Sequence, residues 1–151
     1  MKKTREDAEN MYRACGFYCS EAVVAAIRAN IAPEMPEALI AAASGFPVGV
    51  GRSMCMCGAV SGGVLSLGYF FGRTEPSSAD DPKSVTTMKL AGELQQSFRD
   101  AHGGVLCCHV HTNDGRMELE KLMAQCVSFT GEIAAKTAEI VARELNIEVS
   151  G

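Results

Sequence analysis

The sequence predicts an all-α protein with a single domain over residues 1–151, built as a bundle around a buried, glycine-rich central helix. Three observations lead to this prediction. Apolar residues recur at helical spacing through most of the chain, no segment alternates cleanly enough to be a strand, and one long stretch carries no charge. A length of 151 residues is also typical of one domain that is large enough to bury a core.

The N-terminal part of the chain is expected to form three helices. In the first, Thr4 is the expected cap, Gly16 interrupts the pattern, and apolar side chains follow at helical spacing, at Ala8, Met11, Tyr12 and Cys15. The second runs from about residue 19 to residue 30 and is rich in alanine and valine. The third runs from Pro36, a residue that suits a first helical turn, to residue 44. A glycine-rich loop, residues 45–51, follows.

The uncharged stretch, residues 53–72, is expected to be the central helix. Its 20 residues are long enough to cross a bilayer, but five glycines and three serines keep its hydrophobicity modest. We therefore expect no membrane insertion. Glycines four residues apart, at 58 and 62 and again at 68 and 72, would let neighbouring helices approach closely.

The C-terminal part predicts two longer helices. Asp81 and Pro82 provide a cap and a first turn for a helix that ends near Gly103, with inward side chains expected at Val85, Met88, Ala91, Leu94 and Phe98. A short apolar piece, residues 105–110, leads to a turn at 113–115. The last helix, residues 116–145, has an apolar face that contains Leu119, Leu122, Met123, Cys126, Ile133 and Ile140.

Charge and composition exclude several classes of protein. The net charge of −4 and the scattered basic residues argue against binding to nucleic acid. No apolar run follows the first lysines, so we expect no secretory signal and a cytoplasmic protein. In a reducing compartment, seven cysteines are more often metal ligands or redox groups than structural disulfides.

The cysteines fall into four regions of the chain: 15 and 19, 55 and 57, 107 and 108, and 126. A packed helical domain could bring one thiol from each region to a common point. Four thiolates suit Zn²⁺ or an iron–sulfur cluster. Equally, buried cysteines can simply fill a core, and no Cys-x-x-Cys pair distinguishes the two interpretations.

A family resemblance favours the first interpretation. Residues 57–63, Cys-Gly-Ala-Val-Ser-Gly-Gly, contain a CGAxxG motif, and this segment resembles the hallmark of the C_GCAxxG_C_C family of redox-active proteins. Cys19, which opens an alanine- and valine-rich segment, resembles the family's first cysteine. Cys107, after a glycine pair, resembles its third, and Cys126 in the last helix its fourth. The resemblance covers about residues 12–137.

The resemblance implies a redox-active or electron-transfer protein in which Cys19, Cys57, Cys107 and Cys126 bind an iron–sulfur cluster or a single Zn or Fe ion, with Cys57 and Cys19 as the redox-active thiols. Two alternatives stay open: a non-catalytic zinc-binding or accessory module, and a metal-free thiol–disulfide oxidoreductase. The sequence does not specify the redox partner protein, and a homodimer is a further open point.

The region of the third cysteine departs from the family pattern. Cys108 and His109 stand where the family usually has an arginine and an acidic residue, so Cys108 is an alternative to Cys107 as the functional thiol. His109 and His111 could complete a mixed site, although solvent-facing positions near a turn suit them better. Cys15 and Cys55 have no place in the pattern.

Cys57 is the cysteine expected to ionise most readily. It opens a glycine-rich helical segment, where unpaired N–H groups and the helix dipole stabilise a thiolate. We therefore expect the pKa of Cys57 to be lowered in the metal-free protein. Cys126 lies in mid-helix on an apolar face and is expected to be a ligand or a resolving thiol.

Overall fold

The computed structural model describes residues 1–14, 16–106 and 119–148. Within these ranges the chain forms helices and no β-strand, which confirms the all-α prediction. The elements are α1 (Lys2–Ala14), α2 (Cys19–Asn30), α3 (Ala38–Ala42), the short 3₁₀ helix η1 (Ala43–Gly45), α4 (Pro47–Val50), α5 (Gly58–Phe71), α6 (Pro82–Ala101) and α7 (Leu119–Leu145).

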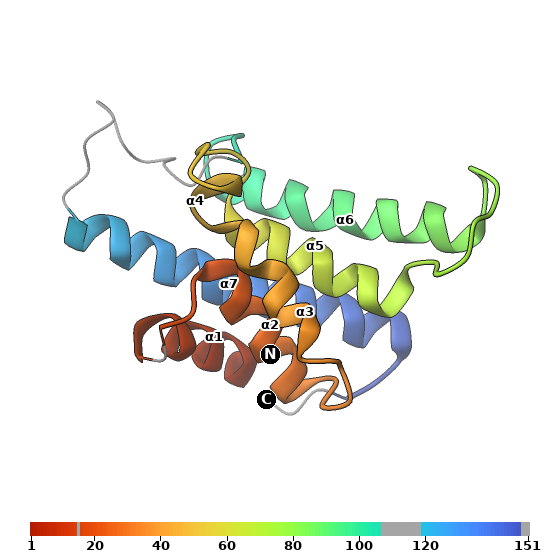
Figure 1. The fold of residues 1–151 in the computed structure, drawn as a ribbon, viewed down its shortest axis with the longest axis horizontal. Coiled ribbons are helices and arrows are strands. Elements are labelled where there is room, and N and C mark those ends of the chain that lie inside the picture. The colour runs from red at the N-terminus through yellow and green to blue at the C-terminus, as the bar shows by residue number, and fades with distance from the viewer. Residues whose placement is uncertain (15, 107–118, 149–151) are drawn as a thin grey trace.

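Helix α5 is the central element that the uncharged stretch predicted. It packs against α2, α6 and α7, and Figure 1 shows it between α6 on one side and the N-terminal helices on the other. The first turns of α5 are buried. Their glycine and serine residues have small side chains, so the neighbouring helices can pack closely against them. Its last turn is only partly buried and ends with the aromatic residues Tyr69, Phe70 and Phe71.

The start of this helix differs from the prediction. The helix begins at Gly58, whereas the uncharged stretch predicted a helix from residue 53. The helix does not extend back to residue 53, because Met54 has a positive φ angle and continues a run of positive φ angles at Val48, Gly49, Val50, Gly51 and Arg52 that also kinks the short helix α4. Left-handed backbone is incompatible with a right-handed helix. The predicted loop at residues 45–51 also contains structure, namely the end of η1 and the short helix α4.

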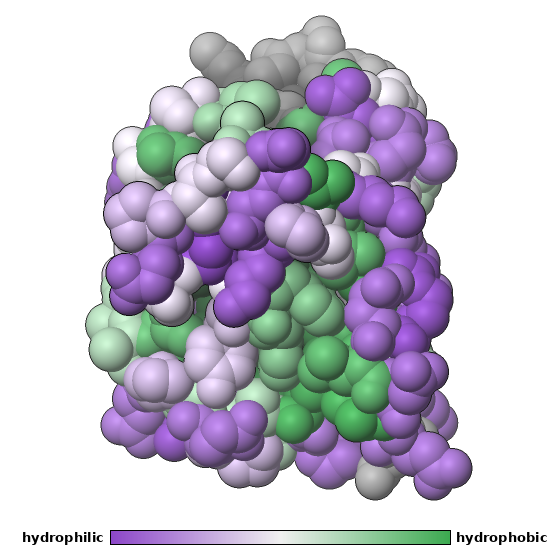
Figure 2. Space-filling model, turned by 90° about the vertical axis from the view of Figure 1, so that its right-hand side faces the viewer, coloured by the Kyte–Doolittle hydropathy of each residue, from purple (hydrophilic) through white to green (hydrophobic). Residues whose placement is uncertain are grey.

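Two apolar clusters form the core. The larger one joins α1, α2, α5, α6 and α7, and includes Phe98, Phe129, Ile133 and Ile140. The smaller one joins α2 to the α3 region and includes Val24, Ile27 and Met35. Figure 2 views the end of the molecule where α5 stops and α6 starts, and hydrophobic residues form a continuous strip there between polar ones.

Helix α1 packs along α7 and α2. The prediction that Thr4 caps this helix is wrong, because the helix already starts at Lys2 and Thr4 is fully buried inside it. Ion pairs four residues apart, including Lys3–Asp7 at 2.6 Å and Arg5–Glu9 at 2.9 Å, support its outer face.

Helix α6 has the predicted cap but a different inward face. The Asp81 side chain accepts hydrogen bonds from the backbone N–H groups of residues 83 and 84, as an N-cap should. Leu94 and Phe98 are buried as expected, whereas Val85 and Met88 are 49% and 64% exposed. Leu90 provides the third buried position instead. The prediction counted too many inward positions on α6. This helix lies on the outside of the bundle (Figure 1), so only a narrow face of it is buried.

Several sequence predictions fall on residues that the structure does not describe. These are Cys15, residues 107–110 of the apolar piece expected over 105–110, the turn expected at 113–115, and the first residues of the last helix. The described part of α7 runs from Leu119 to Leu145, and Ile133 and Ile140 are buried on its inner face. Among the described helices, none combines the length and the apolar character that crossing a membrane requires.

Candidate functional site

Cys57 lies at the start of the central helix. It is the N-cap residue of α5, with φ −53° and ψ 129°, and only 3% of it is exposed. Its backbone N–H donates a hydrogen bond of 2.7 Å to the carbonyl of Leu106. Its side chain makes no capping hydrogen bond, although the nearby backbone N–H groups of Ala59 and Val60 act to lower the pKa of the thiol. These are two of the N–H groups that a helix start leaves without partners in the helix.

The two glycines of the CGAxxG motif allow α2 to lie directly against this helix start. A Cβ atom on Gly58 would lie 2.7 Å from the Cys19 sulfur, and one on Gly62 would lie 2.6 Å from the backbone oxygen of Ser20. A side chain on Gly62 would push the backbone of α2 away, and one on Gly58 would collide with the Cys19 sulfur and the backbone of Phe46. The motif therefore has a physical meaning, since its glycines create the space that Cys19 occupies.

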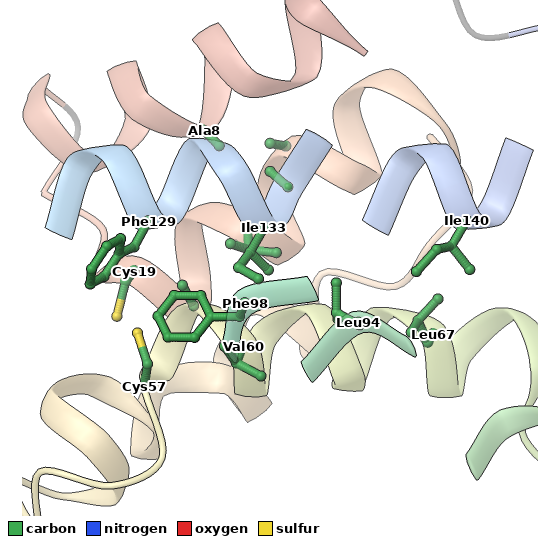
Figure 3. Close-up of a cluster of buried hydrophobic side chains, with 14 of the residues drawn as sticks. Ala8, Cys19, Cys57, Val60, Leu67, Leu94, Phe98, Phe129, Ile133 and Ile140 are labelled. Atoms are coloured by element: carbon green, nitrogen blue, oxygen red, sulfur yellow. The ribbon is translucent and has the colours of Figure 1, made fainter. Parts of the chain in front are cut away.

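Cys19 is the first residue of α2 and is 8% exposed. The Glu21 carboxylate accepts a hydrogen bond of 2.8 Å from the backbone N–H of Tyr18 and so holds the helix start. Figure 3 shows the sulfur atoms of Cys19 and Cys57 pointing toward each other across the gap between the two helices, beside the rings of Phe98 and Phe129. The two thiols lie in the same apolar core cluster.

Cys126 approaches the same place from α7. Together with the other two cysteines it lines a cavity of about 160 Å³ whose remaining walls are almost entirely apolar, formed by Tyr12, Tyr18, Val48, Leu122 and Met123. We call this cavity the thiol pocket. Its three sulfur-bearing residues come from three different elements: the start of α2, the start of α5 and the middle of α7.

The thiol pocket raises the pKa of two of its cysteines, Cys57 and Cys126. Burial, and then the proximity of Cys19, raise the pKa of Cys57 to about 12, although the N–H groups of Ala59 and Val60 act in the opposite direction. The prediction that its pKa is lowered is therefore wrong. The N–H groups of the helix start do lower the pKa, but removal of the thiolate from water outweighs their effect. Burial also raises the pKa of Cys126, while a hydrogen bond from Tyr12 opposes this shift.

Three of the four cysteines assigned to the site thus line one pocket. Cys107 and its alternative Cys108 lie outside the described residues, as do His109 and His111. The carbonyl of Leu106, the residue before Cys107, accepts the hydrogen bond from the backbone N–H of Cys57. Cys55, which had no place in the pattern, is exposed and does not line the pocket.

The described part of the site is not a complete metal site. Across residues 1–14, 16–106 and 119–148, no three histidine, cysteine, aspartate or glutamate side chains are arranged closely enough to hold a metal ion. Cys19, Cys55, Cys57 and Cys126 are reduced thiols in the structure.

The sequence did not reveal the apolar walls of the pocket. Tyr12 was assigned only to the inner face of α1, and nothing local indicates that its ring meets α7. Leu122 and Met123 precede Cys126 by four and three residues, so helical spacing places all three on one face of α7. That spacing was the one available signal. Val48 lines the pocket and has a left-handed backbone conformation, with φ 55°. Nothing in the surrounding sequence indicates this conformation.

The fold and the pocket together define an all-helical protein with buried thiols gathered at the start of its central helix. The chain belongs to the C_GCAxxG_C_C family: the family model, described as "Putative redox-active protein (C_GCAxxG_C_C)", matches residues 17–140. This match confirms the resemblance indicated by the cysteine pattern, and the chain is a member of a redox-active family. No curated protein and no solved structure matches it.

Proposed function

We propose that this chain is a redox protein that works through the thiol pocket, where Cys19, Cys57 and Cys126 bind an iron–sulfur cluster or a single soft metal ion. Cys107 is the proposed fourth ligand. The observation that carries the proposal is the gathering of three thiols from α2, α5 and α7 around one apolar cavity. Sulfur donors are the ligands that iron–sulfur clusters and zinc prefer.

The sulfur donors of the pocket are of the type that such a group prefers, and the three thiols would have to move closer together to hold it. Exclusion of water from the ligand sulfurs is one means by which proteins adjust the potential of an iron–sulfur cluster, and Cys57 is buried. The volume of about 160 Å³ is similar to that of engineered cavities that hold a benzene molecule. A bound cluster or iron ion would supply one-electron transfer. The protein's own residues would hold it, donate hydrogen bonds to its sulfur ligands and keep water away.

The raised pKa values also favour a bound group over a free nucleophile. A thiol with a pKa of about 12 is almost entirely protonated at neutral pH, and the thiolate is the form that attacks other molecules. A metal ion displaces the thiol proton and compensates the charge of the buried thiolate. Burial therefore makes Cys57 a poor nucleophile, but it does not prevent Cys57 from acting as a metal ligand.

Anaerobic purification followed by visible absorption, iron and sulfide analysis and zinc analysis tests the proposal. We expect stoichiometric metal in the wild-type protein and its loss in Cys57→Ser and in Cys126→Ser. Cys55→Ser is the matched control, because Cys55 is exposed and lies outside the pocket. Full metal content in Cys57→Ser, or equal loss in Cys55→Ser, would contradict the assignment.

A second function is favoured by one specific observation, the facing sulfurs of Cys19 and Cys57. In a metal-free protein these two thiols could form a disulfide, giving two electrons and two protons to the disulfide of a partner, which becomes two thiols. This function predicts a colourless protein in which mild oxidation links Cys19 to Cys57, as peptide mapping would show. The proposed metal site predicts instead that the metal-loaded protein resists this oxidation.

A further inference from the structure

A second hollow lies beside the thiol pocket and shares a wall with it. Its volume is about 350 Å³, which is large enough for a small organic molecule. Tyr18 and Val48 line both the hollow and the thiol pocket, so a molecule in the hollow lies directly against the wall of the pocket. The remaining lining residues come from η1 and the residues that follow it: Ser44, Gly45, Pro47, Gly51 and Arg52. We call this cavity the arginine hollow.

Arg52 gives the arginine hollow a positive charge. It is the one charged residue that lines the hollow, and within the described residues its guanidinium forms neither an ion pair nor a hydrogen bond. Its backbone is held on both sides. The N–H of Gly51 donates a hydrogen bond of 3.0 Å to the carbonyl of Gly45, and the N–H of Ser53 donates one of 2.9 Å to the carbonyl of Gly49. Arg52 itself has φ 71°, a strained conformation that in proteins clusters at binding sites.

The groups around Arg52 indicate which anion suits the hollow. The Glu21 carboxylate is engaged nearby, since it accepts hydrogen bonds from the Ser44 hydroxyl at 2.6 Å and from the backbone N–H of Tyr18 at 2.8 Å. Its charge and the net charge of −4 disfavour a dianion. One guanidinium balances a single negative charge, and its planar fork matches a carboxylate. The ring of Tyr18, which is 53% exposed, and the side chain of Val48 offer apolar surface to the rest of such a molecule.

We propose that the arginine hollow binds the carboxylate of a small organic molecule whose apolar part extends over Tyr18 and Val48 to the thiol pocket. This inference rests on the proposed function, because it names the class of molecule that reaches the redox site. The two cavities supply the two parts of one amphiphilic site: a cation in the hollow, and almost entirely apolar walls around the sulfurs. Arg52 is the residue that determines the specificity for an anion.

Binding of 4-benzoylbenzoate and of its uncharged amide, measured by titration calorimetry on the anaerobically purified protein, tests the proposal. We expect the wild type to bind the carboxylate more tightly than the amide. Arg52→Gln should bind the carboxylate about 5-fold more weakly, as the loss of an ion pair that water still reaches predicts, and should bind the amide equally well. Lys89→Gln is the matched control, because it removes one exposed positive charge from α6, outside the hollow. Irradiation of the bound benzophenone should attach it to Met123, which lines the thiol pocket, as peptide mass spectrometry would show.

The possible results separate the arginine hollow from the metal site. Weaker carboxylate binding in Arg52→Gln but not in Lys89→Gln, together with an adduct at Met123, supports the proposal. Equal binding of carboxylate and amide by the wild type, no carboxylate binding at all, or unchanged carboxylate binding by a folded Arg52→Gln protein overturns it. An adduct confined to residues outside the thiol pocket also overturns it, because the molecule would then not extend to the sulfurs. Metal content in the same samples tests the proposed function separately: full metal without carboxylate binding refutes the hollow alone, and carboxylate binding without metal refutes the metal site alone.

Discussion

Replacing Gly62 by alanine tests whether the close approach of α2 and α5 is built into the CGAxxG motif. The added methyl group would lie 2.6 Å from the Ser20 oxygen and 2.9 Å from its Cα atom, well short of the 3.4 Å at which ordinary van der Waals contact begins. These are backbone atoms, so no side-chain rotation can relieve the contact. Helix α2 must shift at Ser20, and the adjacent residue Cys19 must move with it.

Gly68→Ala is the matched control in the same helix. A methyl group there meets nothing within 4 Å. Alanine favours a helix over glycine by about 1 kcal/mol, so Gly68→Ala should raise the free energy of unfolding by up to that amount. Gly62→Ala receives the same helix gain but also the cost of overpacking, typically about 1–3 kcal/mol. Because the helix term is common to both variants, their difference of about 1–3 kcal/mol measures the steric contact alone.

Urea unfolding of the reduced, metal-free variants gives this difference from the transition midpoints, provided that the slopes agree. We expect Gly68→Ala above and Gly62→Ala below the wild type. If both alanines stabilise the protein equally, α2 does not lie against α5 as described, and the explanation of the motif fails.

Two further predictions concern pH and the left-handed segment. Because the pKa of Cys57 is raised from 9.0 to about 12, the folded protein favours the neutral thiol, so the stabilisation is complete below pH 9 and is lost as the pH rises toward 12. Urea midpoints of the reduced, metal-free protein should fall between pH 8 and pH 10 by more in the wild type than in Cys57→Ser, and equal falls would contradict the buried thiol. Gly49 and Gly51 both have positive φ angles. A Cβ atom on Gly49 would collide with the backbone of Met54 and Cys55, whereas a Cβ atom on Gly51 would meet nothing within 4 Å. Gly49→Ala should therefore melt at a clearly lower temperature than Gly51→Ala, although each alanine bears a left-handed strain of about 1 kcal/mol; equal melting temperatures would show that the segment does not fold back on itself.

Local sequence signals predicted the elements whose determinants are local. Asp81 and Pro82 marked the start of α6 because capping involves neighbouring residues. The start of α5 could not be found in this way, since residues 53–72 are uncharged throughout and nothing in their composition distinguishes left-handed backbone from helix. The exposed positions of Val85 and Met88 depend on where α6 lies in the bundle, which only tertiary packing decides.

The site shows the same division. The cysteine pattern identified Cys19, Cys57 and Cys126, because their order along the chain is itself the family signature. The pKa of Cys57 was mispredicted because the helix start is visible in the sequence, whereas the burial that outweighs it is not. Tyr12 was missed as a pocket residue, since the pocket brings it together with Cys126, which is more than 100 positions away in the sequence.

Bridging of two thiols by phenylarsine oxide tests the central claim, that separate helices bring Cys19 and Cys57 to one site. The arsenic atom forms bonds to two neighbouring thiol sulfurs and releases water, whereas a single isolated thiol is not held stably. In the reduced, metal-free, folded protein we expect a bridge between Cys19 and Cys57 that protects both from alkylation, as peptide mass spectrometry would show. The exposed Cys55 should still be alkylated at its normal rate and serves as the internal control. Independent alkylation of Cys19 and Cys57 in the arsenical-treated protein, with no bridge between them, would contradict the account.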